Sequence, residues 1–144
     1  MSTRSVISVV DDDASVRAAL NNLLWAGGYV AHTFGSAEEF LGSPQLNGTS
    51  CVIADVQMSA MNGLELLAYM RAQGCGVPFI LITAFPDESV RARVLKAGAL
   101  GLLTKPFEPL KLFACLDAAL PSGNQDKARQ EDAALVSAGT YGAP

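Results

Sequence analysis

Residues 6–13 have the sequence VISVVDDD, in which a short β-branched run ends abruptly in three acidic residues. A run of this length and composition predicts a buried strand. The acids that follow are typical of a helix start, because carboxylates stabilise the amino end of a helix. The segment therefore predicts a strand, a polar loop and a helix in direct succession.

The same alternation continues along the chain. Further apolar runs predict four more strands, at residues 29–34, 51–54, 78–82 and 100–103. Apolar residues at helical spacing predict five helices, at residues 13–25, 36–41, 63–71, 87–97 and 109–120. Strands that alternate with helices favour an α/β fold: a doubly wound, five-stranded parallel sheet with five helices, flavodoxin-like, with strand order 2-1-3-4-5.

Local signals mark the ends of several helices. Ser36 and Glu39 have the spacing of a capping box at the second helix. Gly27 and Gly28 are expected to end the first helix, and Pro109 fits the first position of the last one.

The composition bounds the organisation and the partners. The chain has 144 residues, of which 50% are hydrophobic and 17% charged, which suits one folded domain, expected over residues 1–120. Residues 121–144 are poor in large apolar side chains and predict a flexible tail or linker. The net charge of −4 argues against direct binding to nucleic acid or to an anionic membrane. No signal peptide and no apolar run long enough to span a bilayer is visible.

The three cysteines, Cys51, Cys75 and Cys115, lie far apart in the sequence. An odd, scattered set matches neither a disulfide framework nor a zinc site. We expect thiols that act as small hydrophobes, with Cys51 packed in the core, in a reducing, cytoplasmic setting.

Polar residues follow four of the five predicted strands. They are Asp11, Asp12 and Asp13 after the first strand, Asp55 after the third, Thr83 after the fourth and Lys105 after the fifth. Because the carboxyl ends of parallel strands meet at one edge of the sheet, we expect these side chains to lie close together. Taken singly, the acids could cap a helix, Thr83 could make a local turn and Lys105 could be an ordinary solvated lysine.

Such a cluster indicates a particular chemistry. Carboxylates gathered in one cleft repel each other unless a cation neutralises them, and Mg²⁺ prefers oxygen ligands of this kind. Lys105 can pair with an acid or a phosphate, and the Thr83 hydroxyl can donate to a phosphoryl oxygen. Together these groups suit phosphoryl transfer onto a carboxylate.

At this point the sequence resembles the receiver domains of bacterial two-component response regulators, over roughly residues 6–120. The motifs that carry the resemblance are Val10-Asp11-Asp12-Asp13, Asp55-Val56-Gln57-Met58, Met61-Asn62-Gly63, Ile82-Thr83-Ala84 and Lys105-Pro106-Phe107. The segments at residues 36–41 and 105–108 are most similar to the FixJ-like branch of that family.

The resemblance implies a phosphoacceptor and a metal site. Asp55 would accept a phosphoryl group from a sensor histidine kinase or a phosphotransfer protein. Mg²⁺ would be bound by Asp12 directly, by Asp11 largely through water, by Asp55, and by the backbone carbonyl of Gln57. Asp13 is given no primary role.

The resemblance also implies a conformational switch. Thr83 would move toward the new phosphoryl oxygens, and Lys105, aimed by a cis peptide bond to Pro106, would pair with the phosphate. The helix at 87–97, the strand at 100–103 and the helix at 109–120 would then serve a homodimer or a partner. The domain would catalyse only its own phosphorylation and dephosphorylation, so it would not be an enzyme in the ordinary sense.

Three residues depart from the family pattern. Ser59 stands where a proline is frequent, and Leu102 stands at the usual position of a switch aromatic residue. Phe85 is bulky where small or polar residues are common, and we expect it to narrow access to the site and slow loss of the phosphoryl group.

Two alternatives remain open from the sequence. A Mg²⁺-dependent phosphatase that forms an aspartyl phosphate would commonly have a second acid two residues after Asp55, where this chain has Gln57, and would need a cap domain. A degenerate receiver that acts only as an interaction module is disfavoured by the complete set of acids, Thr83 and Lys105.

Overall fold

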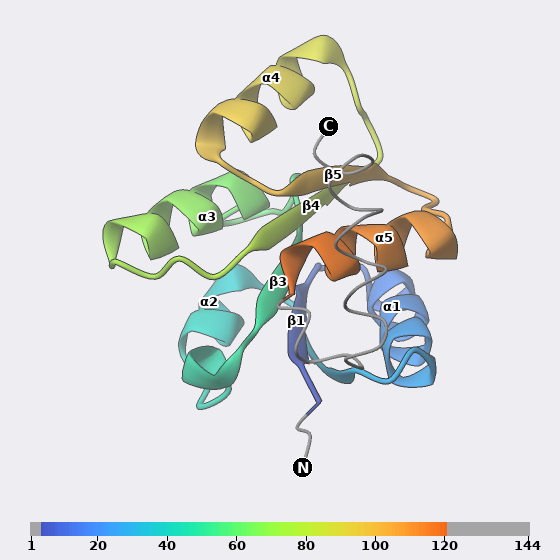
Figure 1. The fold of residues 1–144 in the computed structure, drawn as a ribbon. Coiled ribbons are helices and arrows are strands. Elements are labelled where there is room, and N and C mark those ends of the chain that lie inside the picture. The colour runs from blue at the N-terminus through green and yellow to red at the C-terminus, as the bar shows by residue number, and fades with distance from the viewer. Residues whose placement is uncertain (1–3, 121–144) are drawn as a thin grey trace.

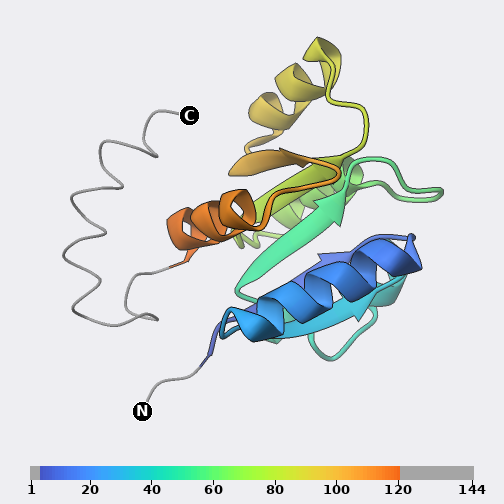
Figure 2. The ribbon, with the colours of Figure 1, turned by 90° about the vertical axis from the view of Figure 1, so that its right-hand side faces the viewer.

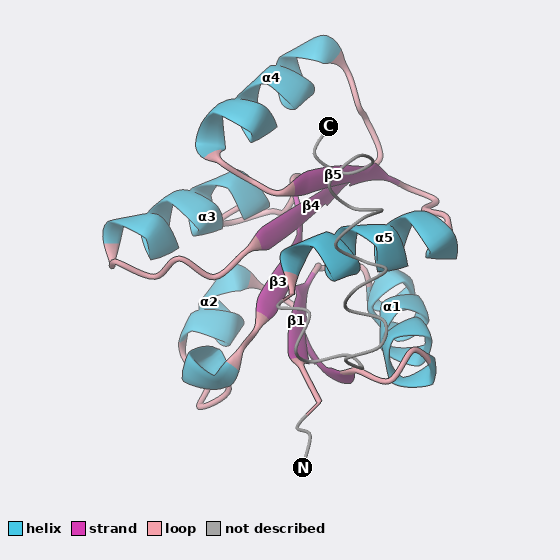
Figure 3. Ribbon diagram, viewed as in Figure 1, coloured by secondary structure: helices cyan, strands magenta, loops and turns pink. Residues whose placement is uncertain are grey.

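The computed structural model describes residues 4–120, and the predicted tail or linker at 121–144 lies outside them. Strands and helices alternate along the chain (Figures 1 and 3). The strands are β1 (Val6–Val10), β2 (Val30–Phe34), β3 (Cys51–Asp55), β4 (Phe79–Thr83) and β5 (Gly101–Thr104). The helices are α1 (Ala14–Ala26), α2 (Ala37–Leu41), α3 (Gly63–Ala72), α4 (Glu88–Ala97) and α5 (Pro109–Ala119), and a short 3₁₀ helix, η1 (Leu46–Gly48), precedes β3.

The strands form one parallel sheet in the order β2-β1-β3-β4-β5, which confirms the predicted topology. The register pairs Val10 with Ala54, Asp55 with Ile82, and Thr83 with Thr104. The carboxyl ends of β1, β3, β4 and β5 are therefore level with one another, so the residues that follow them share one edge of the sheet.

Helices cover both faces of the sheet. Helices α1 and α5 lie on one face, and α2, α3 and α4 lie on the other (Figures 1 and 2). Each face has its own hydrophobic cluster: Leu20 and Leu112 pack in the first, and Phe40 and Leu66 in the second. Every residue of β3 and β4 is buried, which explains the continuous apolar runs at residues 51–54 and 79–82.

The structure corrects the predicted helix cap at residue 36. Ser36 Oγ accepts a hydrogen bond from the Glu39 N–H at 3.0 Å, but the Glu39 carboxylate accepts from the N–H of Gly35 at 2.9 Å instead of completing the box. A complete capping box lies at the start of α3, between Asn62 and Glu65. This box was not predicted, because the usual first residue of the motif is Ser or Thr and here it is Asn.

Other boundaries agree within a residue or two. Strand β2 begins at Val30 and β5 runs from Gly101 to Thr104, each one residue later than predicted. Gly28 and Gly98, just past the ends of α1 and α4, have φ of 94° and 88°, the left-handed conformation that glycine adopts without a steric cost. In the described part of the chain, none of the helices combines the length and the apolar character needed to cross a membrane.

Candidate functional site

Three carboxylates from two strands meet at the carboxyl edge of the sheet. Asp11 and Asp12 follow β1, and Asp55 ends β3. Asp11 and Asp55 are buried and Asp12 is exposed, and one carboxylate oxygen from each lies within 4.8 Å of the others. The structure thus brings together the three acids that the sequence analysis assigned to a metal site.

Lys105 completes this cluster from the loop after β5. Its Nζ lies 2.9 Å from Oδ2 of Asp55 and 3.1 Å from Oδ2 of Asp11. The Lys105 N–H donates to the carbonyl of Thr83 at 2.8 Å, which ties the loop to the end of β4. The peptide bond between Lys105 and Pro106 is cis, as predicted.

Burial and charge shift the pKa values in the cluster. Burial raises the pKa of Asp11, and the neighbouring Asp55 adds to the rise, while the Asp13 N–H and Lys105 oppose it. For Lys105, burial is the largest single influence and lowers the pKa, but the contacts with Asp55 and Asp11 together outweigh it and raise the pKa. Lys105 is therefore a firmly charged ammonium between two acids.

Backbone groups and one arginine fix the orientation of the acids. Oδ1 of Asp11 accepts from the N–H of Asp13 at 2.9 Å, and Oδ1 of Asp55 accepts from the N–H of Gln57 at 3.0 Å. Nη1 of Arg17, on α1, donates to the carbonyl of Asp11 at 2.7 Å. Arg17 was not predicted as part of the site, since its spacing from Asp11 gives no signal until the loop between them is folded.

Asp13 caps helix α1 with its carboxylate, while its N–H donates to Asp11. Its carboxylate accepts from the N–H of Ser15 at 2.9 Å and from the Ser15 hydroxyl at 2.7 Å, which caps α1. Those hydrogen bonds lower the pKa of Asp13. Asp13, which was given no primary role from the sequence, thus has a structural contact at the start of α1.

Thr83 and Gln57 are joined by their side chains. The buried Thr83 hydroxyl donates to Oε1 of Gln57 at 2.9 Å and accepts from the N–H of Phe85 at 3.0 Å. From the sequence, only the backbone carbonyl of Gln57 was assigned a role. The side-chain contact was not predictable, because the two residues are 26 positions apart, one in the loop after β3 and the other at the end of β4.

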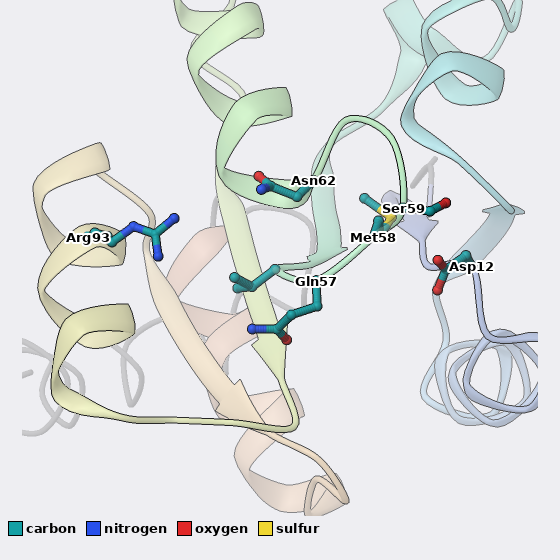
Figure 4. A pocket seen from close by; sticks show the side chains of 7 residues that line it. Asp12, Gln57, Met58, Ser59, Asn62 and Arg93 are labelled. Carbon is teal, nitrogen blue, oxygen red and sulfur yellow. The ribbon is translucent and has the colours of Figure 1, made fainter.

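An open pocket lies beside the acidic cluster (Figure 4). Its volume is about 390 Å³, and it is lined by Asp12, Val56, Gln57, Met58, Ser59, Asn62 and Arg93. In Figure 4 the Arg93 side chain reaches from α4 toward the pocket, with Gln57 between it and Asp12. The pocket borders Asp12, the exposed acid of the cluster.

The three residues that depart from the family pattern take different places. Ser59 lines the pocket, and Leu102 is half-buried against the α2, α3 and α4 side of the core. The Phe85 side chain is 68% exposed and does not line the pocket, so the structure does not support the expectation that it narrows access.

Gly63 allows α3 to pack directly against the backbone of Asp55. A Cβ atom at position 63 would lie 2.6 Å from the Asp55 carbonyl oxygen and 3.1 Å from its carbonyl carbon. Only glycine permits this approach without a shift of the backbone. The motif that contains Gly63 was noted in the sequence, but this reason for the glycine was not.

The cluster fits a hard divalent cation. Oδ2 of Asp11 is buried and, within residues 4–120, accepts no regular hydrogen bond. Its partner there is the ammonium group of Lys105, with which it forms an ion pair. Three carboxylates face one ammonium, which leaves an excess of negative charge. Carboxylate oxygens are ligands that Mg²⁺ prefers, and the exposed Asp12 leaves room for the several water molecules that Mg²⁺ keeps when it binds one or two carboxylates.

Comparison with known proteins agrees with this geometry. The model of the response regulator receiver domain family matches residues 7–117. The chain therefore belongs to this family: it is a receiver domain of the kind found in two-component response regulators.

Curated response regulators resemble the chain at similar levels of identity. It is 35% identical to the transcriptional regulatory protein FixJ of Bradyrhizobium diazoefficiens, over 94% of this chain and 68% of that protein. It is also 35% identical to the response regulator protein TodT of Pseudomonas putida, over 85% of this chain but only 54% of TodT. The curated relatives thus extend well beyond the part that this chain matches.

Solved structures agree in fold. The crystal structure of FixJ-N superimposes with a TM-score of 0.73 at 30% identity, covering 81% of this chain and 94% of that one. The chemotaxis protein CheY4 of Vibrio cholerae gives a TM-score of 0.75 at 28% identity, covering 82% of this chain and all of the other.

Proposed function

We propose that Asp55 is the phosphoacceptor of this receiver domain. The observation that carries the proposal is the meeting of Asp11, Asp12, Asp55 and Lys105 at the end of the sheet. An Asp55 carboxylate oxygen attacks the phosphorus of a phosphohistidine on a sensor histidine kinase or phosphotransfer protein. An O–P bond forms, the P–N bond breaks, and the imidazole nitrogen leaves with the electron pair.

The residues around Asp55 divide the remaining work. Asp12, Asp55 and the backbone carbonyl of Gln57 would bind Mg²⁺ directly and Asp11 largely through water. The ion, when bound, neutralises the phosphoryl oxygens. Lys105 is 2.9 Å from Asp55 and can follow the charge onto the phosphate. Thr83, one strand away, can turn its hydroxyl toward the same oxygens.

The test is phosphorylation with acetyl phosphate and Mg²⁺, followed by intact mass. We expect one labile phosphoryl group on the wild type and none on Asp55→Asn. A wild type that stays unmodified, or an Asp55→Asn variant that is modified equally, would contradict the proposal. The domain is not expected to turn over phosphate esters; sustained turnover would instead favour the phosphatase alternative.

The response to phosphorylation is proposed to use α4, β5 and α5. Three large apolar side chains are exposed on or beside these elements: Leu95 (72%), Leu100 (42%) and Leu110 (82%). Exposed apolar groups of this kind suit a homodimer or a partner surface. Sedimentation of the phosphorylated protein should show a dimer that Leu95→Glu weakens; an unchanged monomer on phosphorylation would argue against a homodimer.

We also propose that residues 1–120 form the receiver unit and that residues 121–144 form a tail or linker. The cellular location that we propose is the cytoplasm, as expected for the family. The net charge of −4 supports the expectation that this chain does not itself bind nucleic acid or membrane.

A further inference from the structure

The hydroxyl of Thr83 both donates and accepts a hydrogen bond in this structure. A threonine hydroxyl has one hydrogen to donate, and that hydrogen goes to Oε1 of Gln57 at 2.9 Å. The oxygen accepts from the N–H of Phe85 at 3.0 Å. Thr83 is fully buried, so solvent water does not reach its hydroxyl.

This arrangement conflicts with donation to a phosphoryl group on Asp55. Before the Thr83 hydroxyl can donate to a phosphoryl oxygen, it must release Oε1 of Gln57, since a single hydrogen cannot serve both acceptors in full. Gln57 loses little in that exchange, because its side chain is exposed and water can hydrate the amide. The hydrogen bond therefore stabilises the unphosphorylated arrangement selectively.

We infer that the Gln57 side chain is a positioning residue that holds Thr83 in its unphosphorylated orientation and so sets how readily the domain switches. The inference rests on the proposed function, in which Thr83 meets the phosphoryl group. It is separate from the proposed metal contact of Gln57, which uses the backbone carbonyl and survives a change of side chain.

The size of the effect follows from the hydrogen bond that is lost. A neutral hydrogen bond changes an equilibrium by about two- to tenfold. Replacing Gln57 with methionine keeps the length of the side chain and removes the acceptor. The Gln57→Met variant should therefore bind a phosphoryl mimic about two- to tenfold more tightly than the wild type.

The experiment is a titration with beryllofluoride in the presence of Mg²⁺, since this mimic binds an aspartyl carboxylate and cannot be hydrolysed. Binding is followed by calorimetry and by the amide NMR signal of Phe85, which reports on the hydrogen bond to Thr83. Because no hydrolysis occurs, an effect of Gln57 on the water that attacks a phosphoryl group cannot enter the result. Gln73→Met, at an exposed glutamine that ends α3, is the matched control.

A double-mutant cycle identifies the contact. The tightening by Gln57→Met should disappear when Thr83 is replaced by valine, which keeps the shape and loses the hydroxyl. Equal or weaker binding by Gln57→Met, or the same tightening in the Thr83→Val background, would overturn the inference. If the wild type does not bind beryllofluoride and so behaves like Asp55→Asn, the proposed function is overturned, and this inference with it.

Discussion

Lys105 and Asp55 are 50 positions apart in the sequence, yet Nζ of one lies 2.9 Å from Oδ2 of the other. The same ammonium lies 3.1 Å from Oδ2 of Asp11, so one cation serves two buried acids. Asp12 adds a third carboxylate beside them. The site therefore has a net negative charge. We expect the stability of the fold to depend on the cations that neutralise it, namely Lys105 and bound Mg²⁺.

Lys105→Met should destabilise the fold. The change leaves Asp11 and Asp55 buried without their positive partner, which we expect to lower the free energy of unfolding by about 1–3 kcal/mol at neutral pH. Urea unfolding measures this difference. Mg²⁺ should restore part of the loss, because it replaces the missing charge.

The control is Lys111→Met, which removes an exposed lysine from α5. It should change the free energy of unfolding by less than about 0.5 kcal/mol. Equal stabilities for the two methionine variants would show that Lys105 does not compensate the buried acids.

Removal of the Asp12 carboxylate should separate metal binding from folding. Asp12 is exposed, so Asp12→Ala should hardly change the unfolding midpoint without metal. The rise of that midpoint on addition of Mg²⁺ should shrink strongly, since a ligand stabilises the folded state according to its affinity. Thermal unfolding with and without Mg²⁺ measures both quantities.

The neighbouring Asp13→Ala should give the opposite pattern. Asp13 caps α1, so its loss should lower the unfolding midpoint, while the response to Mg²⁺ persists. If Asp12→Ala responds to Mg²⁺ as the wild type does, Asp12 is not a ligand.

Gly63→Ala should disturb the proposed phosphoacceptor from behind. The new Cβ would lie 2.6 Å from the carbonyl oxygen of Asp55 and 3.1 Å from Cδ2 of Leu81. We expect a loss of about 1–3 kcal/mol in stability, the usual cost of overpacking. Because the Asp55 backbone must shift, phosphorylation by acetyl phosphate should also slow.

Gly76→Ala is the comparison, because a Cβ there meets no atom within 4 Å. It should leave both stability and phosphorylation close to the wild type. A Gly63→Ala protein as stable and as readily phosphorylated as Gly76→Ala would show that the backbone at Asp55 can give way freely.

The Cys51 thiol should be inert in the folded protein. Burial raises its pKa to about 12, and the nearby Cys115 adds to the rise. Since the thiolate is the reactive form, iodoacetamide at pH 9 should not label Cys51 until the chain unfolds, while the half-buried Cys75 should be labelled first. Mass spectrometry of the digested protein distinguishes the sites, and rapid native labelling of Cys51 would contradict its burial.

The raised pKa of Cys51 should also make the stability of the fold depend on pH. Between about pH 9, the ordinary thiol value, and about pH 12, the unfolded chain loses the Cys51 proton and the folded chain keeps it. The unfolded state then binds fewer protons, so the Cys51 contribution to stability falls as the pH rises through this window. Cys51→Ala should remove that part of the decline.

The predicted fold followed from local signals that survive without tertiary context. Each buried strand is a short apolar run, and the runs at residues 51–54 and 78–82 are continuous because helices cover both faces of the sheet. Once the strands are parallel, their ends share an edge. The meeting of Asp11, Asp55 and Lys105 was therefore predictable from position alone.

The contacts that tune this site were not predictable in that way. Three contacts join groups from separate parts of the chain. They are the hydrogen bond from Thr83 to Gln57, the hydrogen bond from Arg17 to the Asp11 carbonyl, and the close approach of Gly63 to Asp55. They depend on side-chain rotamers and on how far each helix shifts against the sheet. Patterns of apolar residues place a strand or helix and its buried face, but these distances of a few ångströms are set only when the packed elements fix one another.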